Sequence, residues 1–271
     1  MPEAVDASGG MNLVTKSAAV LQALADAGEL SVSELAGLTG EPVSSLYRLL
    51  STLEQIGWVE PGSRRGKARI GLGFVRLGAR LESQLDLREL ARPELERLHE
   101  ETGQTAFLCI RRGLRAVCID RIDGLDVEIH NLGLGESMPL GQGAAPLAIL
   151  AFESEDLVDR YFRERPDDPR FGPVSAGPEE LRAELARTAA AGVAVARNDW
   201  EQGIGGAGAP IFNHRGAVVG ALSVSGQTHR VFRDGYDLVA SVKSAAGNVS
   251  RALGAMRAAN SAVDLFESGA L

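Results

Sequence analysis

Apolar residues in the first part of the chain recur with the spacing of short amphipathic helices. Between Leu13 and Ala27 they recur at steps of four, three and four, which predicts one helix that Gly28 ends. These apolar positions are Val14, Ala18, Leu21 and Ala25. Ser31 and Glu34 have the spacing of a capping box, in which each side chain bonds the other's backbone N–H. A second helix is therefore expected from Ser31 to Thr39.

A turn and a third helix follow. In Thr39–Pro42, Gly40 can take a left-handed conformation, and Pro42 suits the first position of the next helix. Steps of three, four and three predict that this helix turns inward Val43, Leu46, Leu50 and Leu53. Its other faces carry small hydroxyls, a tyrosine and an arginine, which suit the major groove of DNA. The predicted DNA contacts on this helix are Ser44, Ser45, Tyr47, Arg48, Ser51 and Thr52.

A basic hairpin is predicted next. Trp58–Glu60 and Ala68–Gly71 are expected as strands, joined by the tip Gly62–Lys67. A plain three-helix bundle followed by a solvated loop is the alternative. The order of these elements and their shared basic excess favour a winged helix-turn-helix, whose tip contacts the phosphate backbone through Arg64, Arg65 and Lys67.

Charge is distributed unevenly along the chain. The 271 residues carry a net charge of −8, yet residues 43–71 hold five basic against two acidic side chains. Residues 91–271 hold 19 basic against 25 acidic side chains, so DNA contacts are expected in the first quarter of the chain. A hydrophobic content of 45% at this length favours two domains.

The chain shows neither the roughly 20 uncharged apolar residues of a membrane span nor the charge order of a signal peptide. We therefore expect a cytoplasmic protein with no membrane partner.

Residues Leu46–Val59 strongly resemble the recognition helix and first wing strand of IclR-type bacterial regulators. Later segments resemble parts of that family's effector domain: Met138–Leu140, Ala144–Phe152, Gly203–Ile204, Ala209–Asn213 and Ala221–Gly226. Together the resemblance covers residues 13 to about 255. The chain departs from the family pattern at Pro146–Leu147, where Gly-Lys is frequent, and at Asn213, where Asp is common. These departures concern the identity of the ligand rather than the fold.

The expected fold class is α+β, with three parts along the chain. These are a winged helix-turn-helix DNA-binding domain at 11–71, a linker helix at 72–90 and a GAF-like effector-binding domain at 91–260. The linker is expected to be helical from about Phe74 onward. The resemblance implies that it forms a dimer, or a dimer of dimers, since two half-sites require two recognition helices at fixed separation. A helix docked only on its own chain is the alternative.

The effector domain is predicted to begin with a helix that Pro93 opens and Gly103 closes. Strands are expected at Thr105–Ile110, Arg115–Ile122, Val127–Leu132, Val193–Ala196, Ile204–Asn213 and Ala217–Ser225. Helices are expected at Ala144–Phe152, Asp156–Arg165, Glu179–Ala191 and Gly235–Met256.

The chain has two cysteines, Cys109 and Cys118, which are too few for a disulfide framework or a zinc site. A hairpin with a two-residue loop at Gly113–Leu114 would place them opposite each other. Buried small hydrophobes are the favoured interpretation, and a redox pair is the alternative. We expect no metal and no cofactor, because the histidines share no ligand spacing: His99, His130, His214 and His229.

Candidate effector residues lie on one strand and at one helix start. The hydroxyls of Ser223 and Ser225 point to the same side of a strand, and Gly206 lets another backbone approach. Backbone N–H groups near Ala144 and Ala145 would favour a small carboxylate. The resemblance implies the same residues and adds a wall from Asp199 or Glu201. The alternative is that Ser223 and Ser225 are ordinary surface or core residues that bind no ligand.

The sequence predicts a ligand-responsive, sequence-specific transcriptional regulator of double-stranded DNA. The expected form is a repressor of a catabolic operon whose operator affinity is changed by a small organic acid. One alternative is a small-molecule hydrolase that uses Ser223, although Leu222 and Val224 flank it and no Gly-x-Ser-x-Gly elbow exists. Another is an architectural DNA-binding protein without a sensing function.

Overall fold

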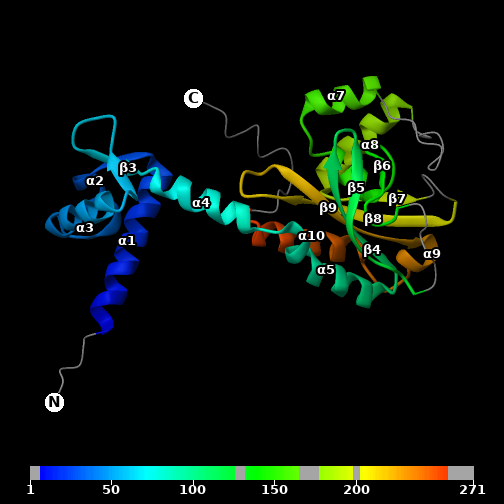
Figure 1. Ribbon diagram of the computed structural model, residues 1–271, viewed down its shortest axis with the longest axis horizontal. Helices are drawn as coiled ribbons and strands as arrows, with labels where there is room; N and C mark the ends of the chain where they lie inside the picture. Colours follow the sequence, from blue (N-terminus) through cyan, green and yellow to red (C-terminus); the bar gives the residue numbers. More distant parts are fainter. Residues whose placement is uncertain (1–6, 126–131, 165–176, 198–201, 256–271) are drawn as a thin grey trace, which may run out of the picture. The chain divides into compact units, whose positions relative to one another are not determined.

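A computed structural model describes residues 7–125, 132–164, 177–197 and 202–255 (Figure 1). The chain divides into two compact units, residues 1–85 and 86–271. Asp199, Glu201, His130 and all but the last residue of the predicted strand Val127–Leu132 lie outside the described residues.

The first unit combines helices with a small sheet. The helices are α1 (Ala7–Ala27), α2 (Val32–Thr39), α3 (Val43–Gln55) and α4 (Gly73–Gln84), and the strands are β1 (Glu29–Ser31), β2 (Val59–Pro61) and β3 (Lys67–Ile70). The strands pair antiparallel in the order β1-β3-β2. The predicted hairpin is therefore extended by a third strand, β1, which the sequence analysis missed. Three residues between two helices are too short for a period-two pattern to be visible.

Local signals account for the helix boundaries of this unit. The Ser31 hydroxyl accepts from the Glu34 N–H at 3.3 Å, and the Glu34 carboxylate accepts from the Ser31 N–H at 2.7 Å, which confirms the capping box. Gly40 has a φ of 71° and ends α2. Pro42 is the N-cap of α3, one position before the predicted one.

The core of the first unit lies between α1, α2, α3 and the sheet. The α3 side chains buried there are Leu46, Leu49, Leu50 and Leu53, and they pack with Val20, Leu24, Leu35 and Val59. The inward prediction for Val43 is wrong, because 46% of its side chain is exposed at the first residue of the helix. Leu49 replaces it as the fourth buried position.

The predicted linker helix is interrupted. Helix α4 ends at Gln84 and α5 (Leu87–Thr102) begins after Asp86, whose carboxylate accepts from the Arg88 N–H at 2.8 Å. This N-cap starts a new helix within the predicted linker range. Pro93 therefore lies inside α5 and does not open it, whereas Gly103, with a φ of 66°, closes it as predicted.

The second unit is built on a six-stranded antiparallel sheet in the order β6-β5-β4-β9-β8-β7. The strands are β4 (Thr105–Arg112), β5 (Arg115–Ile122), β6 (Ser137–Pro139), β7 (Ala194–Arg197), β8 (Ile204–Phe212) and β9 (Val218–Gln227). The longer strands lie within a few residues of their predicted bounds. Cys109 pairs with Cys118 across β4 and β5, and both thiols are free and buried, which confirms the predicted hairpin.

Helices cover both faces of this sheet (Figure 1). Besides α5, the helices described in this unit are α6 (Ala144–Leu150), α7 (Glu155–Glu164), α8 (Pro178–Ala191), α9 (Thr228–Val231) and α10 (Leu238–Ala252). A Cβ on Gly220 would point toward Leu87 of α5, and a Cβ on Gly208 would point toward Ala144 of α6. Since side chains three positions apart on a strand face opposite ways, and Gly208 pairs with Ser223, α5 and α6 lie on opposite faces.

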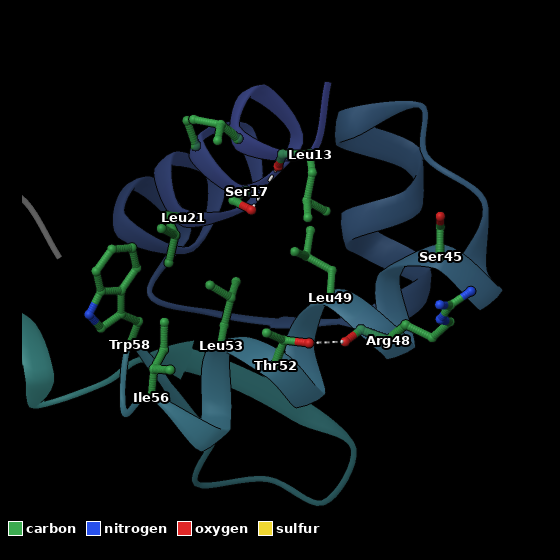
Figure 2. Close-up of a pocket in the computed structure, with 12 residues that line it drawn as sticks. Leu13, Ser17, Leu21, Ser45, Arg48, Leu49, Thr52, Leu53, Ile56 and Trp58 are labelled. Atoms are coloured by element: carbon green, nitrogen blue, oxygen red, sulfur yellow. Dashed lines mark hydrogen bonds between the residues drawn. The ribbon is translucent and has the colours of Figure 1, made fainter. Parts of the chain in front are cut away.

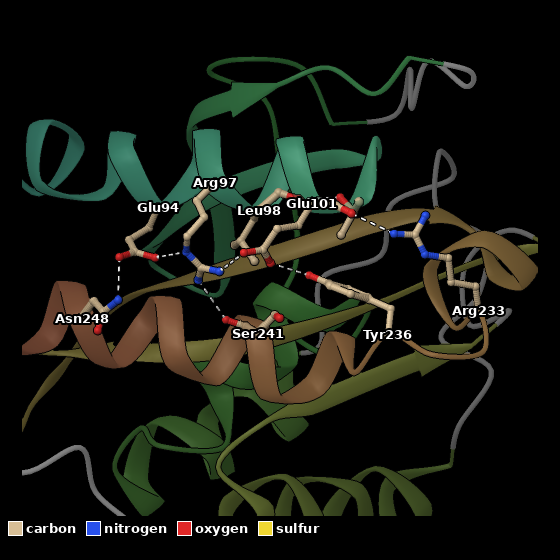
Figure 3. Close-up of polar contacts among 9 residues, drawn as sticks. Glu94, Arg97, Leu98, Glu101, Arg233, Tyr236, Ser241 and Asn248 are labelled. Atoms are coloured by element: carbon tan, nitrogen blue, oxygen red, sulfur yellow. Dashed lines mark hydrogen bonds and ion pairs between the residues drawn. The ribbon is translucent and has the colours of Figure 1, made fainter.

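A ladder of polar contacts joins α5 to α10 and its preceding loop (Figure 3). Asn248 donates to Glu94 at 2.6 Å, Arg97 donates to Glu94 and Glu101, and the Tyr236 hydroxyl donates to Glu101 at 2.8 Å. Burial raises the pKa of the Glu101 carboxyl, but the hydrogen bonds from Tyr236 and Arg97 outweigh it, so this pKa lies below its ordinary value. The ladder fixes the two helices that form one layer of the unit.

Candidate nucleic-acid interface and effector site

Helix α3 presents a polar face on the side opposite its buried stripe. Ser44, Arg48 and Ser51 recur at steps of four and three and are exposed, and Tyr47 beside them is 62% exposed. These side chains make no contribution to the described core, so their residue types are not explained by packing. The arrangement matches a recognition helix, which reads base edges with side chains held out from its own domain.

Two of the predicted contacts lie on the flank of α3 rather than at its centre. Ser45 and Thr52 line a groove of about 670 Å³ between α1 and α3, together with Arg48 (Figure 2). Apolar side chains form most of this groove: Leu13, Val14, Ala18, Leu21, Leu49, Leu53, Ile56 and Trp58. The Thr52 hydroxyl donates to the Arg48 carbonyl at 3.0 Å, so its side chain is turned back along the helix. Ser44, Tyr47, Arg48 and Ser51 are thus the predicted contacts that lie on the exposed polar face of α3.

The wing is shaped by an acidic residue outside it. The Glu29 carboxylate accepts from both the N–H and the hydroxyl of Ser63, each at 2.8 Å. These two hydrogen bonds hold the pKa of Glu29 below its ordinary value. The sequence analysis missed this contact, because 34 residues separate the two partners and neither belongs to a motif.

The three predicted basic residues of the wing differ in their surroundings. Arg64 and Arg65 are exposed at the tip, whereas Lys67 is half-buried at its base. The Lys67 ammonium lies 3.5 Å from a Glu34 carboxylate oxygen and 3.5 Å from the Glu29 carbonyl oxygen. Lys67 therefore helps to join the wing to β1 and α2, and the tip arginines are freer to meet phosphate.

Five of the predicted effector residues lie in the described ranges, on α6 or on the strands of the sheet face that α6 covers: Ala144, Ala145, Gly206, Ser223 and Ser225. Ser225 pairs with Gly206 and Ser223 pairs with Gly208 across β9 and β8. A Cβ on Gly208 would lie 2.6 to 2.8 Å from backbone atoms of Ala144 and Ala145. The absence of a side chain at Gly208 thus lets the start of α6 touch the sheet, beside the buried Ser223. We call the set Gly206, Gly208, Ser223 and Ser225 the serine floor.

Two further residues extend this floor and were missed by the sequence analysis. Phe107 of β4 pairs with Ser223 on one side and with Arg121 of β5 on the other, so the three share a face. The Arg121 guanidinium lies 5.5 Å from the centre of the Phe107 ring, donates to the Leu132 carbonyl at 2.9 Å and forms an ion pair with Asp123. Only the strand order reveals this row, because β9 lies more than one hundred residues beyond β4 in the chain.

The described residues offer little for metal or hydrolytic chemistry. Within the described ranges, no three His, Cys, Asp or Glu side chains gather as metal ligands would. His99 lies against the Gln104 carbonyl and His214 against Arg215, and neither has a hydrogen bond with Ser223. No helix in the described part of the chain has both the length and the apolar character to span a membrane.

Comparison with known proteins identifies the two units. The model of the IclR helix-turn-helix domain matches residues 13–62, and the model of the C-terminal domain of bacterial IclR transcriptional regulators matches residues 79–251. The chain belongs to the IclR family. The chain is thus a DNA-binding transcriptional regulator with an effector domain, and the family, which consists of regulators, does not favour the hydrolase alternative.

Individual IclR relatives match along nearly their whole length. The chain is 31% identical over 242 residues to the HTH-type transcriptional regulator KipR of Bacillus subtilis (strain 168), covering 89% of this chain and 96% of KipR. It is 27% identical over 255 residues to the transcriptional repressor IclR of Escherichia coli (strain K12), covering 93% of each. The crystal structure of the Agobacterium tumefaciens repressor BlcR, 22% identical, has a TM-score of 0.71 and covers 90% of this chain and 98% of BlcR. That last likeness concerns the fold alone.

Proposed function

We propose that this IclR-family regulator is a repressor of a catabolic operon that reads its operator with α3 and contacts flanking phosphates with the wing. The observation that carries the proposal is the exposed polar face of α3, with Arg48 at its centre and the tip arginines Arg64 and Arg65 in the same unit. Bacterial operators lie in the cytoplasm, so we propose that the protein acts there.

A gel shift on the DNA upstream of its own gene and of neighbouring genes tests operator binding. Arg48→Ala is expected to weaken specific binding by about 5- to 150-fold, because a base contact contributes about 1–3 kcal/mol. Arg187→Ala removes the same charge from an exposed position in the other unit and should leave binding unchanged. Equal binding by wild type and Arg48→Ala on every fragment would contradict the reading role of α3.

We further propose that the serine floor holds a small organic acid. Ser223 and Ser225 supply hydroxyls on one face, and Gly208 brings the backbone of Ala144 and Ala145 close to that face. Arg121, whose guanidinium also pairs with Asp123, adds a cation to the same row of strands. Hydroxyls, backbone N–H groups and a guanidinium are the partners that a carboxylate uses. Asp199 and Glu201 remain predicted wall residues. Helix α6 has only seven residues, so its dipole is a minor contribution.

A thermal-shift panel of small carboxylates tests the effector proposal. A ligand at about 100 times its Kd should stabilise the native state by about 2.7 kcal/mol. Ser223→Ala and Ser225→Ala are expected to reduce that shift, while Ser244→Ala, an exposed serine on α10, should keep it. A shift that survives in both floor variants would place the acid elsewhere, and a bound acid that leaves operator affinity unchanged would refute the switch.

We propose that two copies pair through α4 to form a homodimer, or a dimer of dimers. Three apolar side chains are each more than half exposed here: Leu72 just before α4, and Val75 and Leu77 within it. Exposed apolar side chains in one short segment are typical of protein–protein contacts. Sedimentation should show a lower mass for Val75→Glu than for wild type, and an unchanged mass would refute the contact.

A further inference from the structure

The two cysteines lie directly opposite each other in the sheet of the effector unit. Cys109 of β4 pairs with Cys118 of β5, and both side chains are fully buried. The hairpin closes at the two-residue turn Gly113–Leu114. The pair that flanks this turn, Arg112 and Arg115, is a hydrogen-bonded pair. Since hydrogen-bonded and non-hydrogen-bonded pairs alternate in an antiparallel ladder, three steps lead to a non-hydrogen-bonded pair at the cysteines.

The backbone of Cys118 independently supports this assignment. Its N–H donates to the Glu136 carbonyl at 2.9 Å, and its carbonyl accepts from the Gly135 N–H at 2.8 Å. Both groups therefore point away from β4, as they do at a non-hydrogen-bonded position. In such a pair the Cα atoms are about 4.5 Å apart and the side chains approach most closely. That separation falls within the range of about 4.4–6.8 Å that a disulfide requires.

The surroundings of the thiols give them different roles. A hydrogen bond from the Cys109 thiol lowers the pKa of Cys118. Burial and the negative charge of Asp120 oppose this effect and the positive charge of Arg121 adds to it, so the Cys118 pKa lies below its ordinary value. The interaction with Cys118 and burial raise the pKa of Cys109. These directions favour Cys118 as the thiol that ionises and attacks, with Cys109 beside it as the second thiol.

We propose that Cys109 and Cys118 are a modification site that forms a reversible cross-strand disulfide on reaction with hydrogen peroxide. The Cys118 thiolate attacks one peroxide oxygen, the O–O bond breaks, and the leaving hydroxide takes a proton to become water. The Cys109 sulfur then attacks the sulfenic acid on Cys118, the S–O bond breaks, and the thiol proton leaves with hydroxide as a second water. Two thiols and one peroxide give one disulfide and two waters. Because both thiols are fully buried, the reaction requires a local opening of the hairpin wide enough for peroxide, a molecule little larger than water.

The site borders the serine floor. Phe107 pairs with Ser223, and two residues along β4, Cys109 pairs with Ala221. The cysteines, Phe107 and Ala145 of α6 share one buried cluster, so the thiols lie on the face of the sheet that α6 covers. The proposed disulfide does not depend on the proposed effector, and its test measures only thiols.

Full-length protein is exposed to hydrogen peroxide, treated with catalase, denatured, alkylated with N-ethylmaleimide and weighed by mass spectrometry. Wild type should lose two hydrogen atoms and take up no maleimide, and dithiothreitol should restore two additions. A tryptic digest without reduction should link peptides 98–111 and 116–121, which contain the two cysteines. This linkage needs no variant.

Single variants separate a resolving pair from independent oxidation. In Cys109→Ser, Cys118 should be captured as a sulfenic acid by dimedone, whereas in Cys118→Ser the remaining Cys109 should still take up maleimide. Retention of both thiols in wild type, at a peroxide dose that oxidises glutathione in the same tube, would overturn the proposal. Loss of thiols without the linked peptide would overturn it equally.

Discussion

Replacing Gly208 with alanine is expected to push the start of α6 away from β8. A Cβ at this position would lie 2.6 Å from the carbonyl carbon of Ala144, 2.7 Å from its oxygen and 2.8 Å from the Ala145 nitrogen. All three are backbone atoms, which cannot rotate aside as the end of a side chain can. Both elements are buried at this contact, so relief requires a shift of the whole helix start.

The size of the effect follows from two opposing contributions. Overpacking of a buried contact costs about 1–3 kcal/mol, and the lower entropy of the unfolded chain returns up to about 1 kcal/mol for Gly→Ala. Taken at the middle of both ranges, the net loss is about 1–2 kcal/mol. In a unit of this size, a loss of 1 kcal/mol lowers the melting temperature by about 2–4 °C, so Gly208→Ala should lower it by about 2–8 °C.

Differential scanning calorimetry of the full chain measures this change, since the transition of the effector unit can be compared with that of the DNA-binding unit. Gly177→Ala is the control in the same unit, because no atom lies within 4 Å of a Cβ at Gly177. The operator affinity of Gly208→Ala without effector should be retained. A melting temperature equal to or above that of wild type would refute the close approach of α6 to β8.

Three further predictions concern charge. Arg64→Ala should lower operator affinity uniformly across sequences and reduce the slope of log affinity against log salt concentration by about 1, as loss of one phosphate contact does. Lys67→Ala should lower operator affinity and, in addition, the melting temperature of its unit, because Lys67 contacts Glu34. An unchanged salt slope for Arg64→Ala would refute the wing contact. Glu101→Gln should lower stability to urea at neutral pH, because hydrogen bonds from Tyr236 and Arg97 lower the folded-state pKa of Glu101. That stabilisation is present above the unfolded-state pKa and is lost as pH falls through the folded-state pKa, so the stability difference from wild type should vanish in acid. Glu100→Gln, at an exposed position, should show no such difference. A stability difference between Glu101→Gln and wild type that persists in acid would contradict this reasoning.

Elements whose boundaries are set by neighbouring residues were predictable from sequence. The capping box at Ser31 and Glu34 and the left-handed Gly40 place the ends of α2 through contacts within one turn of chain. The pairing of Cys109 with Cys118 follows from a two-residue turn in the same way. In each case, the residues that decide the structure are less than ten positions apart.

Elements that depend on distant partners were not predictable. Strand β1 exists because Leu30 and its neighbours pair with β3, nearly forty residues away. The break between α4 and α5 shows a different difficulty, since leucines continue with helical spacing through it. There, the Asp86 side chain caps a new helix, and a single N-cap outweighs the apolar pattern.

The serine floor combines both situations. That Ser223 and Ser225 share a side follows from the period of a strand and needs no knowledge of the fold. The register of β8 with β9 places Gly208 beside Ser223, and the face that α6 covers places Gly208 against Ala144. The row from Ser223 through Phe107 to Arg121 depends further on β4 lying between β9 and β5. The position of Arg121 beside the serine floor is therefore set by the order of the strands. Residue patterns along the chain indicate the serine hydroxyls but not this arginine.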